Sequence, residues 1–368
     1  MTQKSKPRYL FIDIVKVIAL FCMAIIHVNS LFTEYFDMGA MAYTADRNLV
    51  DYIGSILYLF APGVFMICMG FVMKNSSTNT SEKIAKRGLK LLLTGIILNF
   101  FRYSISFIVI SLVNYDISSF VEAILWLFRS DILFFAGLYF LVYSLLLKLK
   151  VNDLTILIIA IVLQVIGTLL PPITTNNSFI NSLIGNFVYS DSQSFFPFVW
   201  WMIYPTIGYL YGKGYDNTQN KNRYMLICIV SSIALFLLTS LSINLLGSNI
   251  NEYLFWGQHS LTMKTPSMLL TISFEIAYIS IIYFLFEKIN SDIIRNLISS
   301  ISIRLNTIYC IHWTLLTNTF LVVSFILIIN ITKTYQVILT GIILMIVSIL
   351  VSFIIKPIKK EKIIHRVA

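Results

Sequence analysis

The sequence contains few charged residues. Asp, Glu, Lys and Arg make up 12% of the 368 residues, whereas soluble domains carry about 25%. Hydrophobic residues make up 58%, and the mean hydropathy is +0.83. This composition excludes an ordinary soluble domain and indicates an integral membrane protein.

Cysteine and the usual catalytic motifs are also scarce or absent. The four cysteines, Cys22, Cys68, Cys228 and Cys310, lie in apolar runs without paired spacing, so we expect no disulfide or metal site and assign them to packing. GxSxG, HExxH and Walker motifs are missing. These absences leave chemistry inside a helix bundle, or transport, as the remaining classes.

Apolar runs near the length of a bilayer span recur along the whole chain. They predict an all-α integral membrane protein, a bundle of about ten transmembrane helices in one multi-pass domain over 1–368. The expected spans are roughly 9–32, 52–73, 88–112, 131–149, 153–170, 195–212, 223–246, 266–288, 304–329 and 334–356. The weaker apolar stretch 118–128 is expected to be an interfacial segment, and the first span is too long and too charged for a cleavable signal peptide.

The excess of basic residues fixes the expected topology. With the N-terminus in the cytoplasm, 21 of the 27 Lys and Arg residues fall on the inner side, and only Arg47, Arg129, Lys264 and Lys333 fall outside. Both termini are therefore predicted to be cytoplasmic, in the cell membrane and among its lipids. This distribution explains the net charge of +10 without nucleic acid as a partner.

Two ionisable residues lie inside the first predicted span, Lys16 and His27. Eleven helical residues return to nearly the same face, so the two side chains share one stripe roughly 16 Å long, together with Asp13 and Glu34. An intramembrane ionisable residue indicates a functional site. The alternative is structural, with Asp13 paired to Lys16 and His27 bonded to a neighbouring helix.

Three more polar residues fall inside predicted spans: Arg102, Glu275 and His312. Charges at that depth should pair or face a wet cavity, and a polar interior shared by four helices would hold them. Two structural alternatives remain open at this point. They are an Arg102–Glu275 salt bridge and a His312 that is satisfied in the core.

Several segments resemble known membrane acyltransferases. RYLFIDIVKVIALFCMAIIHVN (8–29) resembles the first helix of acyltransferase family 3, in which a basic residue precedes a histidine by eleven positions, with Lys16 where Arg is commoner. APGVFMICMGFVM (61–73) and KRGLKLLLTGIILN (86–99) resemble its second helix and its basic cytoplasmic motif, with Arg87 and Lys90 where two Arg are usual. SFFPFVWWMIYPTIGYLYGK and LTMKTPSMLLTISFEIAY resemble bacterial heparan-α-glucosaminide N-acetyltransferase-like proteins, and NTIYCIHWTLL is similar to a late segment of both groups.

The resemblance implies transfer of an acyl group, with acyl-CoA (acetyl-CoA) as co-substrate and no metal. His27 would be the base or the acyl carrier, with Lys16 and Asp13 beside it as catalytic residues. Arg87, Lys90, Arg102, Glu275 and His312 would serve the donor, the first two by meeting its phosphates at the cytoplasmic mouth. The polar outer loops 171–194 and 247–265 would meet a glycan or lipid-linked acceptor, unless they are plain connections.

We therefore expect a membrane acyltransferase that moves an acetyl group from the cytoplasm to an extracytoplasmic glycan or lipid-linked sugar. A transporter or flippase for a polar solute is the main alternative, but the inverted repeats and broken helices typical of that class are not evident in the sequence. An inert membrane scaffold fits the polar stripe least well. A homo-oligomer is compatible with the sequence.

Overall fold

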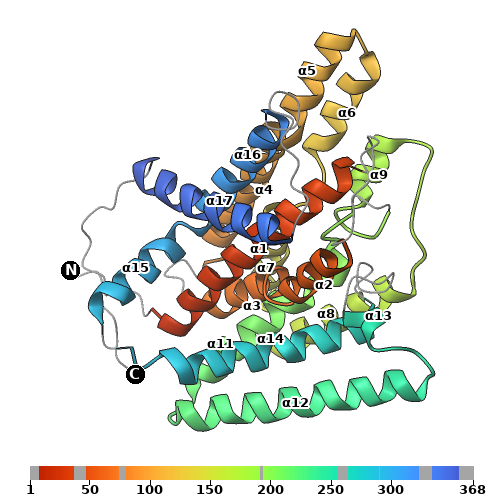
Figure 1. The fold of residues 1–368 in the computed structure, drawn as a ribbon. Helices are drawn as coiled ribbons and strands as arrows, with labels where there is room; N and C mark the ends of the chain where they lie inside the picture. Colours follow the sequence, from red (N-terminus) through yellow and green to blue (C-terminus); the bar gives the residue numbers. More distant parts are fainter. Residues whose placement is uncertain are drawn as a thin grey trace. The chain divides into compact units, whose positions relative to one another are not determined.

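A computed structural model describes residues 8–36, 47–73, 80–190, 194–254, 264–289, 291–322 and 334–355 (Figure 1). Its regular elements over these residues are all helical, which confirms the predicted all-α class. They are α1 (Leu10–Phe36), α2 (Arg47–Tyr58), α3 (Pro62–Met73), α4 (Ser81–Asn99), the π-helix η1 (Phe100–Ser104), α5 (Ile105–Asn114), α6 (Ile117–Leu127), α7 (Ile132–Lys148), α8 (Asp153–Leu169), α9 (Ser178–Ile184), α10 (Phe198–Trp201), α11 (Ile203–Asn217), α12 (Lys221–Leu245), α13 (Asn251–Leu254), α14 (Thr265–Phe286), α15 (Asp292–Ile303), α16 (Leu305–Val322) and α17 (Thr334–Ile355).

Six of the helical stretches among the described residues are long and apolar enough to cross a membrane, or seven if the bent pair α6 and α7 counts as one span. The expected number of about ten is therefore not confirmed. Three predicted spans account for the difference. The span 304–329 extends past the described residues, since Val322 is the last described residue of α16. The predicted span 195–212 is divided between the short α10 and α11, and α8, at 17 residues, is shorter than a full span.

The chain divides into two compact units. Unit 1 comprises residues 1–68, 214–257 and 269–368, and unit 2 comprises residues 69–213 and 258–268. The single domain expected over 1–368 stays a prediction, and each unit is described by itself below.

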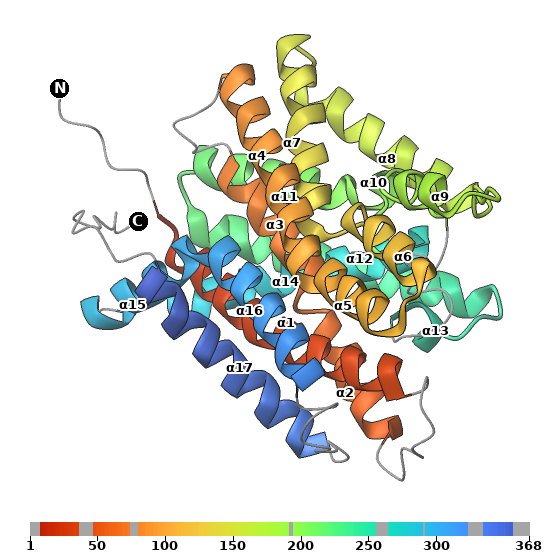
Figure 2. The same ribbon diagram turned by 90° about the horizontal axis from the view of Figure 1, so that it is seen from above.

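Unit 1 is built around α1, which packs against α2, α15, α16 and α17 (Figure 2). Gly341 lets α17 approach α1 closely, because a Cβ there would lie 2.8 Å from the Ile25 Cα. At its start, α1 is tied to the end of α14 by the backbone N–H of Phe11, which donates to Glu287 Oε2 (3.2 Å). These contacts fix the helix that carries Lys16 and His27.

Unit 2 is built on the close pair α4 and α7. A Cβ on Gly88 would lie 2.9 Å from the Gly137 carbonyl oxygen, so the two backbones approach as membrane helices do through small residues. Ser81 at the start of α4 and Ser144 near the end of α7 join the two helices, because each hydroxyl donates to the other residue's carbonyl (3.0 and 2.7 Å). The axis of α7 bends by 42° from that of α6 at residues 128–131.

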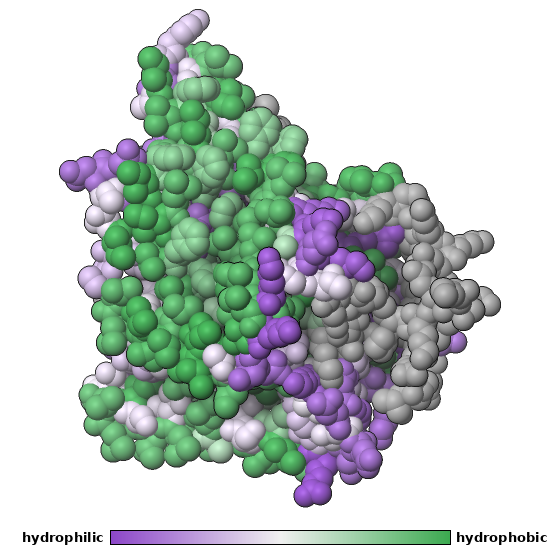
Figure 3. All heavy atoms as spheres, turned by 180° about the vertical axis from the view of Figure 1, so that it is seen from behind, coloured by the Kyte–Doolittle hydropathy of each residue, from purple (hydrophilic) through white to green (hydrophobic). Residues whose placement is uncertain are grey.

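The surface is strongly apolar, as the space-filling view in Figure 3 shows for one face. Large hydrophobic side chains such as Leu226, Val230 and Leu238 on α12 and Leu154 on α8 are more than half exposed. Exposing such a surface to water is unfavourable in free energy, whereas exposing it to lipid is not. The exposed apolar helices therefore support a multi-pass membrane protein.

Candidate functional site

Asp13 anchors the inner end of α1. Its carboxylate accepts from Arg8 Nη2 (2.6 Å) and Nε (3.2 Å), and from the Ser302 (2.6 Å) and Ser299 (3.2 Å) hydroxyls of α15. Only 5% of the residue is exposed. A buried carboxylate with several donors, one of them a guanidinium, is held firmly. The structural partner of Asp13 is thus Arg8, not Lys16 as the structural alternative supposed, and its predicted catalytic role stays a prediction.

His27 lies against a second imidazole and an indole. Its Nδ1 is 3.2 Å from His312 Nε2, and its ring centroid is 3.9 Å from that of Trp313 at an interplanar angle of 31°. His312 on α16 is fully buried, whereas His27 is half-buried. A ring nitrogen oriented by a hydrogen bond on its other side is the arrangement used by catalytic bases and nucleophiles. The fold brings together two of the predicted site residues, 285 positions apart.

Lys16 and Glu275 belong to the same unit. Lys16 is half-buried on α1, and Glu275, in the middle of α14, is 2% exposed. Both charges, and that of Asp13, act on the Cys68 thiol of α3. These side chains of α1 and α14 are therefore within electrostatic range of Cys68 in unit 1. The predicted polar interior, which includes Arg102, stays a prediction.

Arg102 is paired with Asp131 inside unit 2. Its Nη1 donates to Asp131 Oδ2 (3.3 Å), and its guanidinium lies 4.4 Å from the centre of the Tyr103 ring. Asp131 also caps α7 by accepting the Leu133 N–H (2.8 Å). The Arg102–Glu275 salt bridge, left open above as a structural alternative, would join residues of the two units and stays a prediction.

Arg129 is also buried, although the sequence predicts it in an outer segment. It is 7% exposed, and its guanidinium lies over the rings of Trp126 (3.9 Å), Phe195 (4.4 Å) and Tyr103 (5.2 Å). Asn99 donates to the carbonyls of Leu127 (3.2 Å) and Arg129 (3.0 Å), which the break between α6 and α7 frees. These hydrogen bonds satisfy carbonyl groups at a helix break inside unit 2, where unsatisfied carbonyls would be costly.

Arg87 and Lys90 lie on the exposed side of α4 in unit 2. The Arg87 guanidinium is 4.7 Å from the centre of the Phe140 ring on α7. A basic pair on an exposed helical face fits either a phosphate-binding role or the usual cytoplasmic positive charge. Its role as a donor contact stays a prediction.

The family model described as an acyltransferase domain matches residues 9–356. The chain belongs to acyltransferase family 3. The match confirms the resemblance seen in the first helix. The likeness to heparan-α-glucosaminide N-acetyltransferase-like proteins is not confirmed. No curated protein and no solved structure matches the chain.

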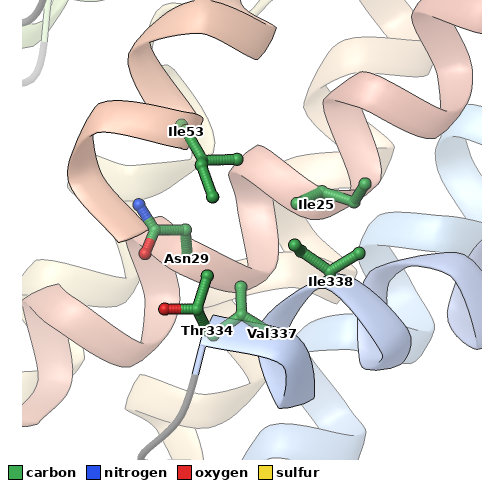
Figure 4. Close-up of a pocket in the computed structure, with 7 residues that line it drawn as sticks. Ile25, Asn29, Ile53, Thr334, Val337 and Ile338 are labelled. Carbon is green, nitrogen blue, oxygen red and sulfur yellow. The ribbon is translucent and has the colours of Figure 1, made fainter. Parts of the chain in front are cut away.

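The protein is accordingly a membrane acyltransferase. The cavity in Figure 4, beside α1, is lined by Ile25, Asn29, Ile53, Gly54, Thr334, Val337 and Ile338. Its volume of about 10 Å³ is room for roughly one water molecule. It is too small for an acyl donor, so it does not mark the donor site of this acyltransferase.

No group of three or more His, Cys, Asp or Glu side chains among the described residues could hold a metal ion. In unit 1 the described candidate residues are His27 with His312, Lys16 and Glu275, and their roles in catalysis stay predictions.

Proposed function

We propose that this membrane acyltransferase transfers an acetyl group from cytoplasmic acetyl-CoA to a hydroxyl or amine of an extracytoplasmic glycan or lipid-linked sugar. The observation that carries the proposal is the His27 imidazole, held by His312 and Trp313 on a helix fixed at its inner end by Asp13. Acyl transfer needs a base or nucleophile that works near neutral pH, and an ordinary imidazole titrates near 6.5.

The direction of transfer rests on the distribution of charge. Basic residues are concentrated on the predicted cytoplasmic side, where Arg87 and Lys90 would meet the phosphates of coenzyme A. Lys16 lies about 16 Å inward of His27 along α1, between that side and the imidazole. Its ammonium would stabilise negative charge on the donor as the acyl group moves outward.

The transfer can follow either of two routes, and atoms and charges balance in both. In one, a His27 nitrogen attacks the thioester carbonyl, the C–S bond breaks, and an acyl-histidine then passes the acyl group to the acceptor. In the other, His27 removes the proton of the acceptor while the acceptor attacks the thioester directly. In both, the acceptor loses one proton and the coenzyme A sulfur gains one.

The test is the substitution His27→Ala in membranes supplied with labelled acetyl-CoA and a preparation of cell-surface glycans. We expect transfer per folded protein to fall by at least about 10² to 10⁴, the usual contribution of a positioned base. His365→Ala in the C-terminal tail is the matched control and should keep wild-type turnover. Wild-type turnover by folded His27→Ala protein would exclude the proposed role and favour transport.

A further inference from the structure

Glu275 has a carboxyl oxygen that the described part of the fold leaves unused. The residue is 2% exposed, its Oε2 has no hydrogen-bond partner among the described residues, and none of them forms an ion pair with it. Gly63 leaves the space that the carboxyl occupies. A Cβ there would overlap Oε1 and would lie 2.5 Å from Oε2 and 2.7 Å from the carboxyl carbon.

The surroundings of Glu275 favour its neutral, protonated form. Tyr58 of α2 and Cys68 of α3 lie close enough for the charge of Glu275 to act on them, and neither offers that carboxyl a positive charge. Lys16 of α1 is the cation whose charge also acts on Cys68, and Asp13 is the opposing anion. An isolated carboxylate in an apolar interior is expensive, so the group keeps its proton instead.

The level of Glu275 can be placed against that of His27. The hydrogen bond from the Phe11 N–H to Glu287 places the inner ends of α1 and α14 at the same level, and the two helices run antiparallel in Figures 1 and 2. Twelve residues separate Glu275 from Glu287, about 18 Å of helix, and the same rise along α1 reaches Met23. Glu275 therefore lies about one helical turn on the cytoplasmic side of His27, near the level of Cys22, which acts on Tyr278 of α14.

We infer that Glu275 is the general acid that protonates the departing coenzyme A sulfur, an inference that rests on the proposed function. In water a thiolate leaves unaided, but in this apolar interior its charge would be as costly as that of a lone carboxylate. A donor that enters from the cytoplasm places its sulfur on the cytoplasmic side of the carbonyl carbon that His27 reaches. Glu275 lies on that same side of His27.

The step balances. As the new bond to the acyl carbon forms, the C–S bond breaks, its electron pair stays on sulfur, and the Glu275 proton moves to that sulfur. Glu275 is left as a carboxylate. On the direct route His27 holds the proton of the acceptor; on the covalent route His27 becomes an acylated imidazolium with no added proton, and the acceptor releases its proton when it takes the acyl group. Transfer of the acceptor's proton to Glu275 restores both groups, so no outside acid or base is consumed.

The test compares two donors of identical shape in full-length protein reconstituted in lipid: acetyl-CoA and its selenoester analogue. A selenol is a stronger acid than a thiol, so its anion leaves without a proton. We expect Glu275→Gln to lower kcat for acetyl-CoA by about 10² to 10⁴, and to lower kcat for the selenoester by less than about tenfold. Equal losses on both donors, or no loss on either, would overturn the inference. Glu122→Gln, a carboxyl outside unit 1, is the matched control and should leave both rates unchanged.

A second measurement is independent of activity. The protonated carboxyl should give an infrared C=O band in wild-type protein that shifts in D₂O and is missing in Glu275→Gln. Absence of that band overturns the inference whatever the enzyme does. Wild-type protein that shows the band but transfers no acetyl group from either donor would instead refute the proposed function, and with it the assignment of the acid to this step.

Discussion

In unit 2 the buried carboxylate of Asp131 pairs with Arg102 and accepts the Leu133 N–H, whereas in unit 1 the buried carboxyl of Glu275 has an oxygen without a hydrogen-bond partner among the described residues. Both residues are 2–3% exposed, so burial does not distinguish them. What differs is the number of partners. A buried charge with partners on every side holds helices together, and a buried acid with an unused oxygen is available for proton transfer.

The same contrast holds inside unit 1. Asp13 has several donors and fixes α1, while His27, two-thirds of the way along the same helix, touches a second imidazole whose hydrogen bond can be reversed by a change of tautomer. The stripe that the sequence predicts therefore has one end that Asp13 fixes and one end, at His27, where we propose the chemistry. Substitutions that separate stability from turnover test this division.

The largest effect on stability is expected at Asp131. Asp131→Ala would leave Arg102 in its buried site without that carboxylate and would remove the cap of α7, which we expect to cost about 3–5 kcal/mol. The measurement is the yield and melting temperature of detergent-solubilised protein. Asp131→Asn is the matched control, because it keeps the oxygen that accepts the Leu133 N–H. Full stability of both variants would show that the break between α6 and α7 does not depend on this pair.

The sequence predicts the positions of Lys16 and His27 because a charged residue inside an apolar run is visible without a structure. It does not predict the contact between His27 and His312, because no spacing rule relates residues 285 apart. The sequence predicts Arg129 in an outer segment, between the stretch 118–128 and the span 131–149. Arg129 is instead buried, because Tyr103 of η1 and Asn99 provide aromatic and amide partners that only the tertiary fold brings near. The number of about ten spans is not confirmed for a related reason, since apolarity alone does not reveal where a helix breaks.

A change in turnover without a change in stability is expected at Lys16. Lys16→Ala should lower kcat by about 10²-fold, comparable to the loss of one group that stabilises developing negative charge. Lys16→Arg keeps the charge and should keep most of the activity. The measurement is acetyl transfer from labelled acetyl-CoA, normalised to folded protein by size-exclusion chromatography. A fall in melting temperature that accounts for the whole loss in Lys16→Ala would place Lys16 with Asp13 among the structural residues.

The smallest effect on stability is expected at the turn between α5 and α6, which takes no part in either buried polar centre. Tyr115 adopts a left-handed conformation there (φ 53°), and the Asp116 carboxylate accepts the Ser118 (2.9 Å) and Ser119 (3.2 Å) backbone N–H groups at the start of α6. Hydrogen bonds from the Ser118 and Ser119 hydroxyls, and from these N–H groups, lower the pKa of Asp116 from 3.8 to about 2. Because the folded pKa is depressed, this stabilisation is complete above pH 3.8 and is lost as the pH falls through about 2. Melting curves of wild-type and Asp116→Asn protein should therefore differ slightly at neutral pH and converge below this window. A difference that persists at the lowest pH would mean that the carboxylate charge is not what holds the turn.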